Sequence, residues 1–117
     1  MGMKILNKNL GKRESVFNKF HKKITTEFPE MNWREFPIYV IYFIDELVLA
    51  IVYFRGDNIS DKEIDVGFNI NKKPNDNFVD AKYMNYKGIN YSIKIEDKKN
   101  SLNQVEKAFK IIKNNEI

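Results

Sequence analysis

Cysteine is absent from this chain of 117 residues, which has one histidine, one tryptophan and three prolines. Without cysteine the chain has no disulfide framework, no thiolate zinc site and no thiol nucleophile. The lone histidine, His21, excludes a multi-histidine metal site, and we interpret it as an exposed helix residue. The sequence also lacks the glycine-rich loops that cradle phosphate in nucleotide-binding enzymes. We therefore expect no catalytic residues, no metal site, no cofactor and no enzyme activity.

A membrane-spanning run is also missing. The most apolar stretch, IYVIYFIDELVLAIVYF at 38–54, is shorter than the roughly 20 residues of a membrane helix and has Asp45 and Glu46 at its middle. Its β-branched and aromatic residues favour strands, so we predict a β-hairpin of strands 38–44 and 47–54 around an Asp45–Glu46 turn. Both faces of this hairpin are apolar. We expect helices to cover one face, and loops, a ligand or a partner to cover the other.

Two further segments, 63–70 and 89–95, alternate between apolar and polar residues and are predicted to be strands. In the second of these we expect four side chains to point inward, those of Ile89, Tyr91, Ile93 and Ile95. Residues 71–77 are polar and contain Pro74, which predicts a loop. Residues 78–88 show no clear period, and we assign them no regular structure.

Apolar residues recur at helical spacing over 13–28 and over 101–115. Pro29 ends the first helix, and Ser101 with Gln104 has capping-box spacing at the second. The predicted fold is therefore α+β, a two-layer sandwich in the order α-β-β-β-β-α. Its antiparallel sheet has four strands or slightly more, with N- and C-terminal helices. Length predicts a single domain over 1–117, in which 1–10 are flexible and Met3 is an alternative natural first residue.

The net charge of +4 is uneven, because residues 1–23 carry seven basic side chains and only one acidic one, Glu14. A basic end beside a near-neutral body is typical of contact with nucleic acid or another polyanion. The same basicity also follows from AT-rich codons, since lysine, asparagine and isoleucine are all abundant. The first residues lack the apolar core of a secretion signal, so we expect a cytoplasmic location.

An aromatic segment contributes the second candidate surface. It holds aromatic side chains for stacking and two lysines for phosphate, namely Phe78, Lys82, Tyr83, Tyr86, Lys87 and Tyr91. Trp33 with Arg34 could add a further platform. The alternative is that these aromatics close the open end of a small core.

Carboxylates are also close together in and after the predicted loop that follows residue 54, at Asp57, Asp61, Glu63 and Asp65. Such oxygen ligands suit Mg²⁺ or Ca²⁺, but their spacing fits no EF-hand loop. We interpret Asp65 as an outward-facing strand residue and the others as a solvated turn. No metal site is therefore predicted here.

Four stretches carry a family resemblance: 38–54, EIDVGFNI at 63–70, KYMNYKGINYSIKI at 82–95 and SLNQVEKAFKIIK at 101–113. With these, the chain from Phe36 to Lys113 resembles the family known as domain of unknown function 5655, a group of small bacterial domains. The resemblance implies a fold related to domain of unknown function 1801 and to double-wing DNA-binding-like proteins. It also implies nucleic-acid or defence-related work, and it carries over no catalytic residue. Val52, Tyr53 and Phe54 depart from the family's lysine-rich strand edge.

The sequence thus predicts a small non-enzymatic binding module that contacts nucleic acid or a nucleotide in a bacterial defence or DNA-associated context. The predicted contact residues are Lys12, Arg13, Lys19, Lys22, Lys23, Lys82, Tyr83, Tyr86 and Lys87. The alternative is a protein-interaction domain, such as a homodimer, that uses the apolar face of the 38–54 hairpin. A third option is a small-molecule pocket between the sheet and the 78–88 segment.

Overall fold

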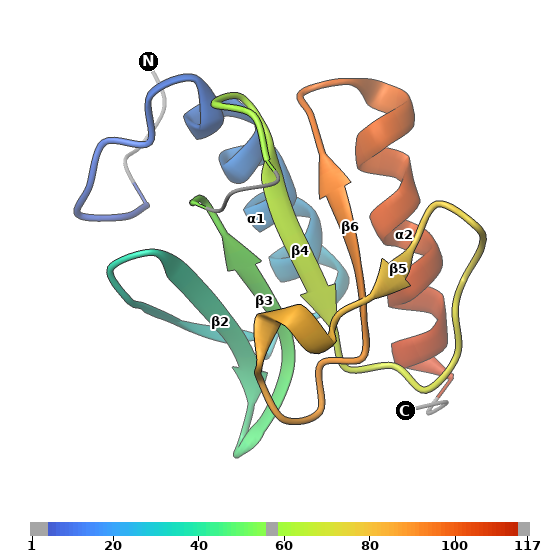
Figure 1. The fold of residues 1–117 in the computed structure, drawn as a ribbon. Coiled ribbons are helices and arrows are strands. Elements are labelled where there is room, and N and C mark those ends of the chain that lie inside the picture. Colours follow the sequence, from blue (N-terminus) through green and yellow to red (C-terminus); the bar gives the residue numbers. More distant parts are fainter. Residues whose placement is uncertain (1–4, 56–58, 115–117) are drawn as a thin grey trace.

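Both long helices lie on one face of a six-stranded antiparallel sheet (Figure 1). The structure is a computed structural model, and it describes residues 5–55 and 59–114. A short 3-10 helix, η1 (Gly11–Arg13), leads into α1 (Glu14–Glu27), and α2 (Lys99–Lys113) closes the fold. The strands and the second 3-10 helix are β1 (Asn32–Glu35), β2 (Tyr39–Ile44), β3 (Leu47–Tyr53), β4 (Ile64–Phe68), β5 (Val79–Asp80), η2 (Lys82–Met84) and β6 (Tyr91–Ile95). The predicted α+β sandwich is confirmed.

The predicted hairpin is also confirmed and forms the second and third strands of the sheet. Its two strands pair from Tyr39 opposite Tyr53 to Ile44 opposite Leu47. Asp45 turns the chain with φ of 55°, a left-handed conformation that aspartate tolerates better than most residues. The strand order is β1-β2-β3-β4-β6-β5. The two strands missing from the sequence prediction are therefore the short edge strands, β1 and β5.

The main core lies between the helices and the sheet face they cover, which we call the inner face. Its centre is a triangle of phenylalanines from three elements, Phe20 of α1, Phe68 of β4 and Phe109 of α2. Their ring centroids are 6.1 to 6.4 Å apart, within the range for favourable aromatic pairs. All three side chains are fully or almost fully buried, so both helices and the sheet share one apolar core.

A second, smaller core lies on the opposite face, which we call the outer face. There, residues 81–89, which we name the strap, cross β3 and β4 (Figure 1). Ile51 of β3 packs against Met84 and Ile89 of the strap, above Gly67 of β4. Ile89, predicted to point inward, belongs to this outer core, because the chain reaches β6 only two residues later. Residues 78–88, predicted to be irregular, contain β5 and η2.

The start of α2 also differs from the prediction. No side chain caps the helix at Lys98, so the predicted capping box of Ser101 and Gln104 is wrong. The Ser101 hydroxyl instead accepts a hydrogen bond from the Glu96 amide at 2.9 Å. Gln104 accepts one from the Asn75 side chain at 2.9 Å, so both residues join the helix to preceding segments.

Candidate nucleic-acid interface

The predicted contact residues lie on two sides of the sheet. Lys12, Arg13, Lys19, Lys22 and Lys23 belong to η1 and α1, on the side of the inner face. The other four, Lys82, Tyr83, Tyr86 and Lys87, belong to the strap on the outer face (Figure 1). The sheet separates the two groups, so the two candidate surfaces face opposite sides of the molecule.

Most of the basic side chains on the helix side already have partners. Ammonium groups face carboxylates in the pairs Lys12–Asp61 at 3.4 Å, Lys19–Asp97 at 2.5 Å and Lys23–Glu106 at 3.6 Å. The Arg13 guanidinium donates to the backbone carbonyls of Ser60 and Glu63, both at 2.7 Å, and so ties the β3–β4 connection to the helix. Lys22 alone of these five has no such partner among the described residues. Three of these five positive charges are thus in ion pairs with carboxylates.

In the strap, Tyr83 is exposed to solvent and also bonds the strap to the sheet. Its ring is 54% exposed, while its hydroxyl donates to Asp65 Oδ2 at 2.7 Å. The same hydroxyl lies 2.7 Å from Ser92 Oγ. Because the single hydrogen of the Tyr83 hydroxyl is given to Asp65, the Ser92 hydroxyl donates to Tyr83. The Lys94 ammonium lies 5.9 Å from the centre of the ring. Tyr83 thus fastens the strap to β4 and β6, and its ring remains open to stacking.

Asp65 faces outward as predicted, but it is buried, not solvated. Tyr83 lies against it, and its Oδ1 atom has no hydrogen-bond partner among the described residues. Burial raises the pKa of Asp65, and the hydrogen bond from Tyr83 opposes that rise. The described residues contain no group of three or more side chains that could hold a metal ion, and Asp57 lies outside them.

His21 was predicted to be exposed, and that prediction is wrong. Its side chain is buried, with Nδ1 2.9 Å from the hydroxyl of Tyr42 on β2. Trp33 of β1 meets it edge-on, with ring centroids 4.4 Å apart. Burial lowers the pKa of His21, so the ring is neutral at pH 7. His21 therefore joins α1 to the sheet instead of facing solvent.

A row of aromatic side chains lies on the outer face. Of its residues, Tyr86 alone is among the predicted contact residues, and those on the hairpin belong to the face named in the alternative prediction. Phe36 stacks on Tyr39 with ring centroids 4.8 Å apart, and Tyr39 lies 5.1 Å from Tyr53. These three residues, with Phe43 and Tyr86, are half-buried and pack around the second core. Burial, followed by the nearby hydroxyls of Tyr39 and Tyr86, raises the pKa of Tyr53. We call the five residues the aromatic row.

Cationic side chains border this row. The Arg34 guanidinium lies 5.7 Å from the centre of the Phe43 ring, a cation–π distance. Lys82 and Lys87 are exposed in the strap, and their ammonium groups have no ion pair or hydrogen bond within residues 5–55 and 59–114. Trp33 was expected to share a platform with Arg34, but it packs on His21 of α1, on the side of the inner face. The outer face therefore combines open ring surface with unpaired positive charge.

Part of this row could have been found from the sequence. Alternation along the first hairpin strand places Tyr39, Ile41 and Phe43 on one face. The sequence does not show which of these side chains the strap covers and which it leaves exposed to solvent. Alternation gives no such signal for Arg34, because β1 has only four residues, or for Phe36, which lies just after β1.

Known proteins offer no guide to this site: the chain matches no family model, no curated protein and no solved structure. The resemblance to domain of unknown function 5655 therefore stays a prediction. Within the described ranges, no helix has the length and apolar character needed to cross a membrane.

Proposed function

We propose that this protein is a non-enzymatic binding module whose outer face holds a single-stranded nucleic acid or a nucleotide. The aromatic row carries the proposal, since half-buried rings on a sheet present flat surfaces on which bases stack whatever their sequence. Arg34, Lys82 and Lys87 would supply the charge for phosphate. The role in bacterial defence or DNA-associated work rests on the family resemblance alone.

The outer face supports this function better than the helix side does. On α1, Lys19 and Lys23 are in ion pairs that a phosphate would have to break, which leaves Lys22 as the only lysine of α1 with no ion pair among the described residues. On the outer face, no such exchange is needed for Lys82 or Lys87, which have no carboxylate partner in the described part of the chain. The proposed site therefore keeps Lys82, Tyr83, Tyr86 and Lys87 from the sequence prediction. It replaces the helix residues with the aromatic row and Arg34.

The test is fluorescence anisotropy of a labelled oligo(dT) titrated with the protein at low salt. We expect saturable binding whose affinity falls linearly with the logarithm of salt concentration. Tyr39→Leu keeps apolar bulk but removes a stacking surface, and should weaken binding about tenfold. Tyr91→Leu is the matched control, because Tyr91 is also half-buried in a strand but faces the inner core. Absence of binding at low salt, or equal losses in both variants, would contradict the proposal.

A second candidate is a protein-interaction domain, favoured by exposed apolar side chains on the hairpin. Leu47 is 47% exposed and Ile38 is 38% exposed, at opposite ends of the two strands. Each end of the hairpin therefore offers an exposed apolar side chain to a partner protein. Light scattering over a range of concentrations tests the homodimer: a mass that rises toward twice the chain mass supports it, and a constant monomer mass argues against it.

A further inference from the structure

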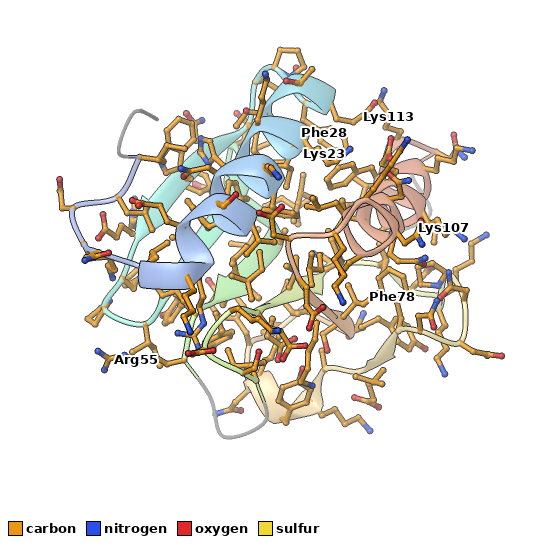
Figure 2. All side chains as sticks on the ribbon, turned by 90° about the horizontal axis from the view of Figure 1, so that it is seen from above. Lys23, Phe28, Arg55, Phe78, Lys107 and Lys113 are labelled. Carbon is orange, nitrogen blue, oxygen red and sulfur yellow. The ribbon has the colours of Figure 1, made fainter. Side chains whose placement is uncertain are left out.

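A groove at the end of the hairpin lies apart from the aromatic row. It opens where α1 and α2 both finish and where the β2–β3 turn lies, and its volume is about 740 Å³. Figure 2 shows Phe28, just past the end of α1, near Lys113 at the end of α2. Phe28, Leu49 and Ile112 are buried and form its apolar base. The two helix ends and the β2–β3 hairpin therefore border one open groove.

The border of this groove is acidic. Four carboxylates line it, those of Glu27, Glu30, Asp45 and Glu46, against the single ammonium of Lys113. Lys113 pairs with Glu27, which leaves the other three carboxylates without an ion pair among the described residues. Both helices also direct the negative ends of their dipoles here, and the last turn of α1 has no basic residue to offset its dipole. The potential in the groove is therefore negative.

The groove also has an exposed apolar contact. Leu47, the first residue of β3, is 47% exposed between the acidic turn and the apolar base, and Ile44 beside it is half-buried. The carboxylates are spaced around this apolar surface and do not converge, since no group of described residues is placed to hold a metal ion. Spaced negative charges around an apolar centre complement an apolar side chain flanked by long cationic ones.

We propose that this groove docks a basic peptide segment of a partner protein. An apolar side chain of the peptide packs on Ile44 and Leu47, and flanking lysine or arginine side chains contact Glu30, Asp45 and Glu46. Nucleic acid does not fit this end of the molecule, because phosphates would face the same carboxylates. The inference is independent of the outer-face function, since its residues and those of the aromatic row do not overlap.

The probe is a fluorescein-labelled synthetic peptide with one leucine flanked by two lysines on each side. Anisotropy at low salt should show saturable binding to the intact protein. Glu46→Lys should weaken it about tenfold, because it replaces an attraction by a repulsion. Leu47→Ser should weaken it about fivefold by removing the apolar contact. A peptide with serine in place of leucine should show the same loss without any change in the protein.

Two exposed positions elsewhere provide matched controls. Asp76→Lys makes the same change of charge sign at a residue outside the groove, and Val79→Ser changes a side chain with the same 47% exposure as Leu47. Both should leave peptide affinity within about twofold of the parent, since distant exposed changes are nearly neutral. Equal losses in groove and control variants would overturn the proposal by showing non-specific charge attraction. Failure of the peptide to bind the intact protein at low salt would also overturn it.

Discussion

At the scale of single residues, Asp65 shows how the strap changes the chemistry of the sheet. A strand aspartate on an open face would be solvated, but Tyr83 lies against this one and leaves Oδ1 without a partner among the described residues. A carboxylate in this setting disfavours its charged form, since burial removes hydration that one hydrogen bond replaces only in part. The consequence is a measurable dependence of stability on pH.

Because burial raises the pKa of Asp65, the folded chain holds this proton more tightly than the unfolded chain does. The resulting stabilisation is complete below the ordinary value of 3.8 and is lost as pH rises through the folded pKa. We therefore predict that Asp65→Asn is more favourable, relative to the parent, at pH 7 than at pH 4. Urea unfolding of both proteins across this range measures the difference. A constant difference would show that Asp65 titrates normally in the folded chain.

The contribution of His21 to stability is predicted to change with pH in the opposite direction to that of Asp65. Burial lowers its pKa below 6.5, so the unfolded chain gains the proton first as pH falls. Stability from the neutral, Tyr42-bonded ring is therefore complete above pH 6.5 and declines as pH falls below it. His21→Gln keeps a polar side chain but cannot titrate, so its stability curve should lose this decline. An unchanged slope between pH 7 and pH 5 would contradict the prediction.

At the scale of elements, the strap depends on the absence of a side chain at Gly67. A Cβ atom there would lie 2.5 Å from Ile89 Cγ2 and 2.6 Å from Met84 Sδ, closer than packed atoms approach. The strap reaches this position through left-handed turns at Asn85, with φ of 52°, and Gly88, with φ of 92°. The close contact between strap and sheet therefore requires glycine at position 67.

We predict that Gly67→Ala destabilises the fold by about 1–3 kcal/mol, the usual cost of overpacking a filled core. Amides of the strap should exchange with deuterium faster, while those of α1 keep their protection. Ile89→Ala removes the Cγ2 atom, so the double variant should lose less stability than the two single changes together. Additive losses, or faster exchange spread evenly over the chain, would show that the contact at Gly67 does not hold the strap.

Periodicity accounts for what could be predicted among these elements. Both helices and the four long strands have apolar patterns over five or more residues, and all six were expected near their observed positions. The strands β1 and β5, with four and two residues, are too short to show a period, and their pairing depends on neighbours already in place. The strap has no period either, because a 3-10 helix and left-handed residues define it. His21 was misassigned because its burial comes from Trp33 and Tyr42, which are distant in sequence.

At the scale of the whole molecule, three surfaces differ in their charges and side chains. The helix side has several lysines in ion pairs beside others, such as Lys22, that have none among the described residues. The outer face has aromatic rings with unpaired cations, and the hairpin end has an acidic groove. A sequence pattern gives the number of charges but not their partners. For this reason the ion pairs of Lys12, Lys19 and Lys23 could not be predicted, and neither could the stacking of Phe36 on Tyr39.

This separation predicts which lysines matter for binding a polyanion. Lys82→Ser with Lys87→Ser should lower oligo(dT) affinity and reduce the slope of its dependence on salt, because fewer counterions are released. Lys107→Ser with Lys110→Ser removes the same charge from α2, on the helix side, and should change neither quantity by a comparable amount. Figure 2 shows Lys107 on that helix. The reverse ranking of the two double variants would locate binding on the helix side.

The most direct test of the outer-face proposal is an NMR titration of the isotopically labelled protein with unlabelled oligo(dT). The proposal predicts chemical-shift changes that concentrate at Arg34, Phe36, Tyr39, Tyr53 and Tyr86, with the exposed face of α1 unaffected. Shifts concentrated at Lys12, Lys19, Lys22 and Lys23 would contradict it and restore the basic helix as the contact surface. No shifts at all at low salt would show that the outer face does not bind single-stranded nucleic acid.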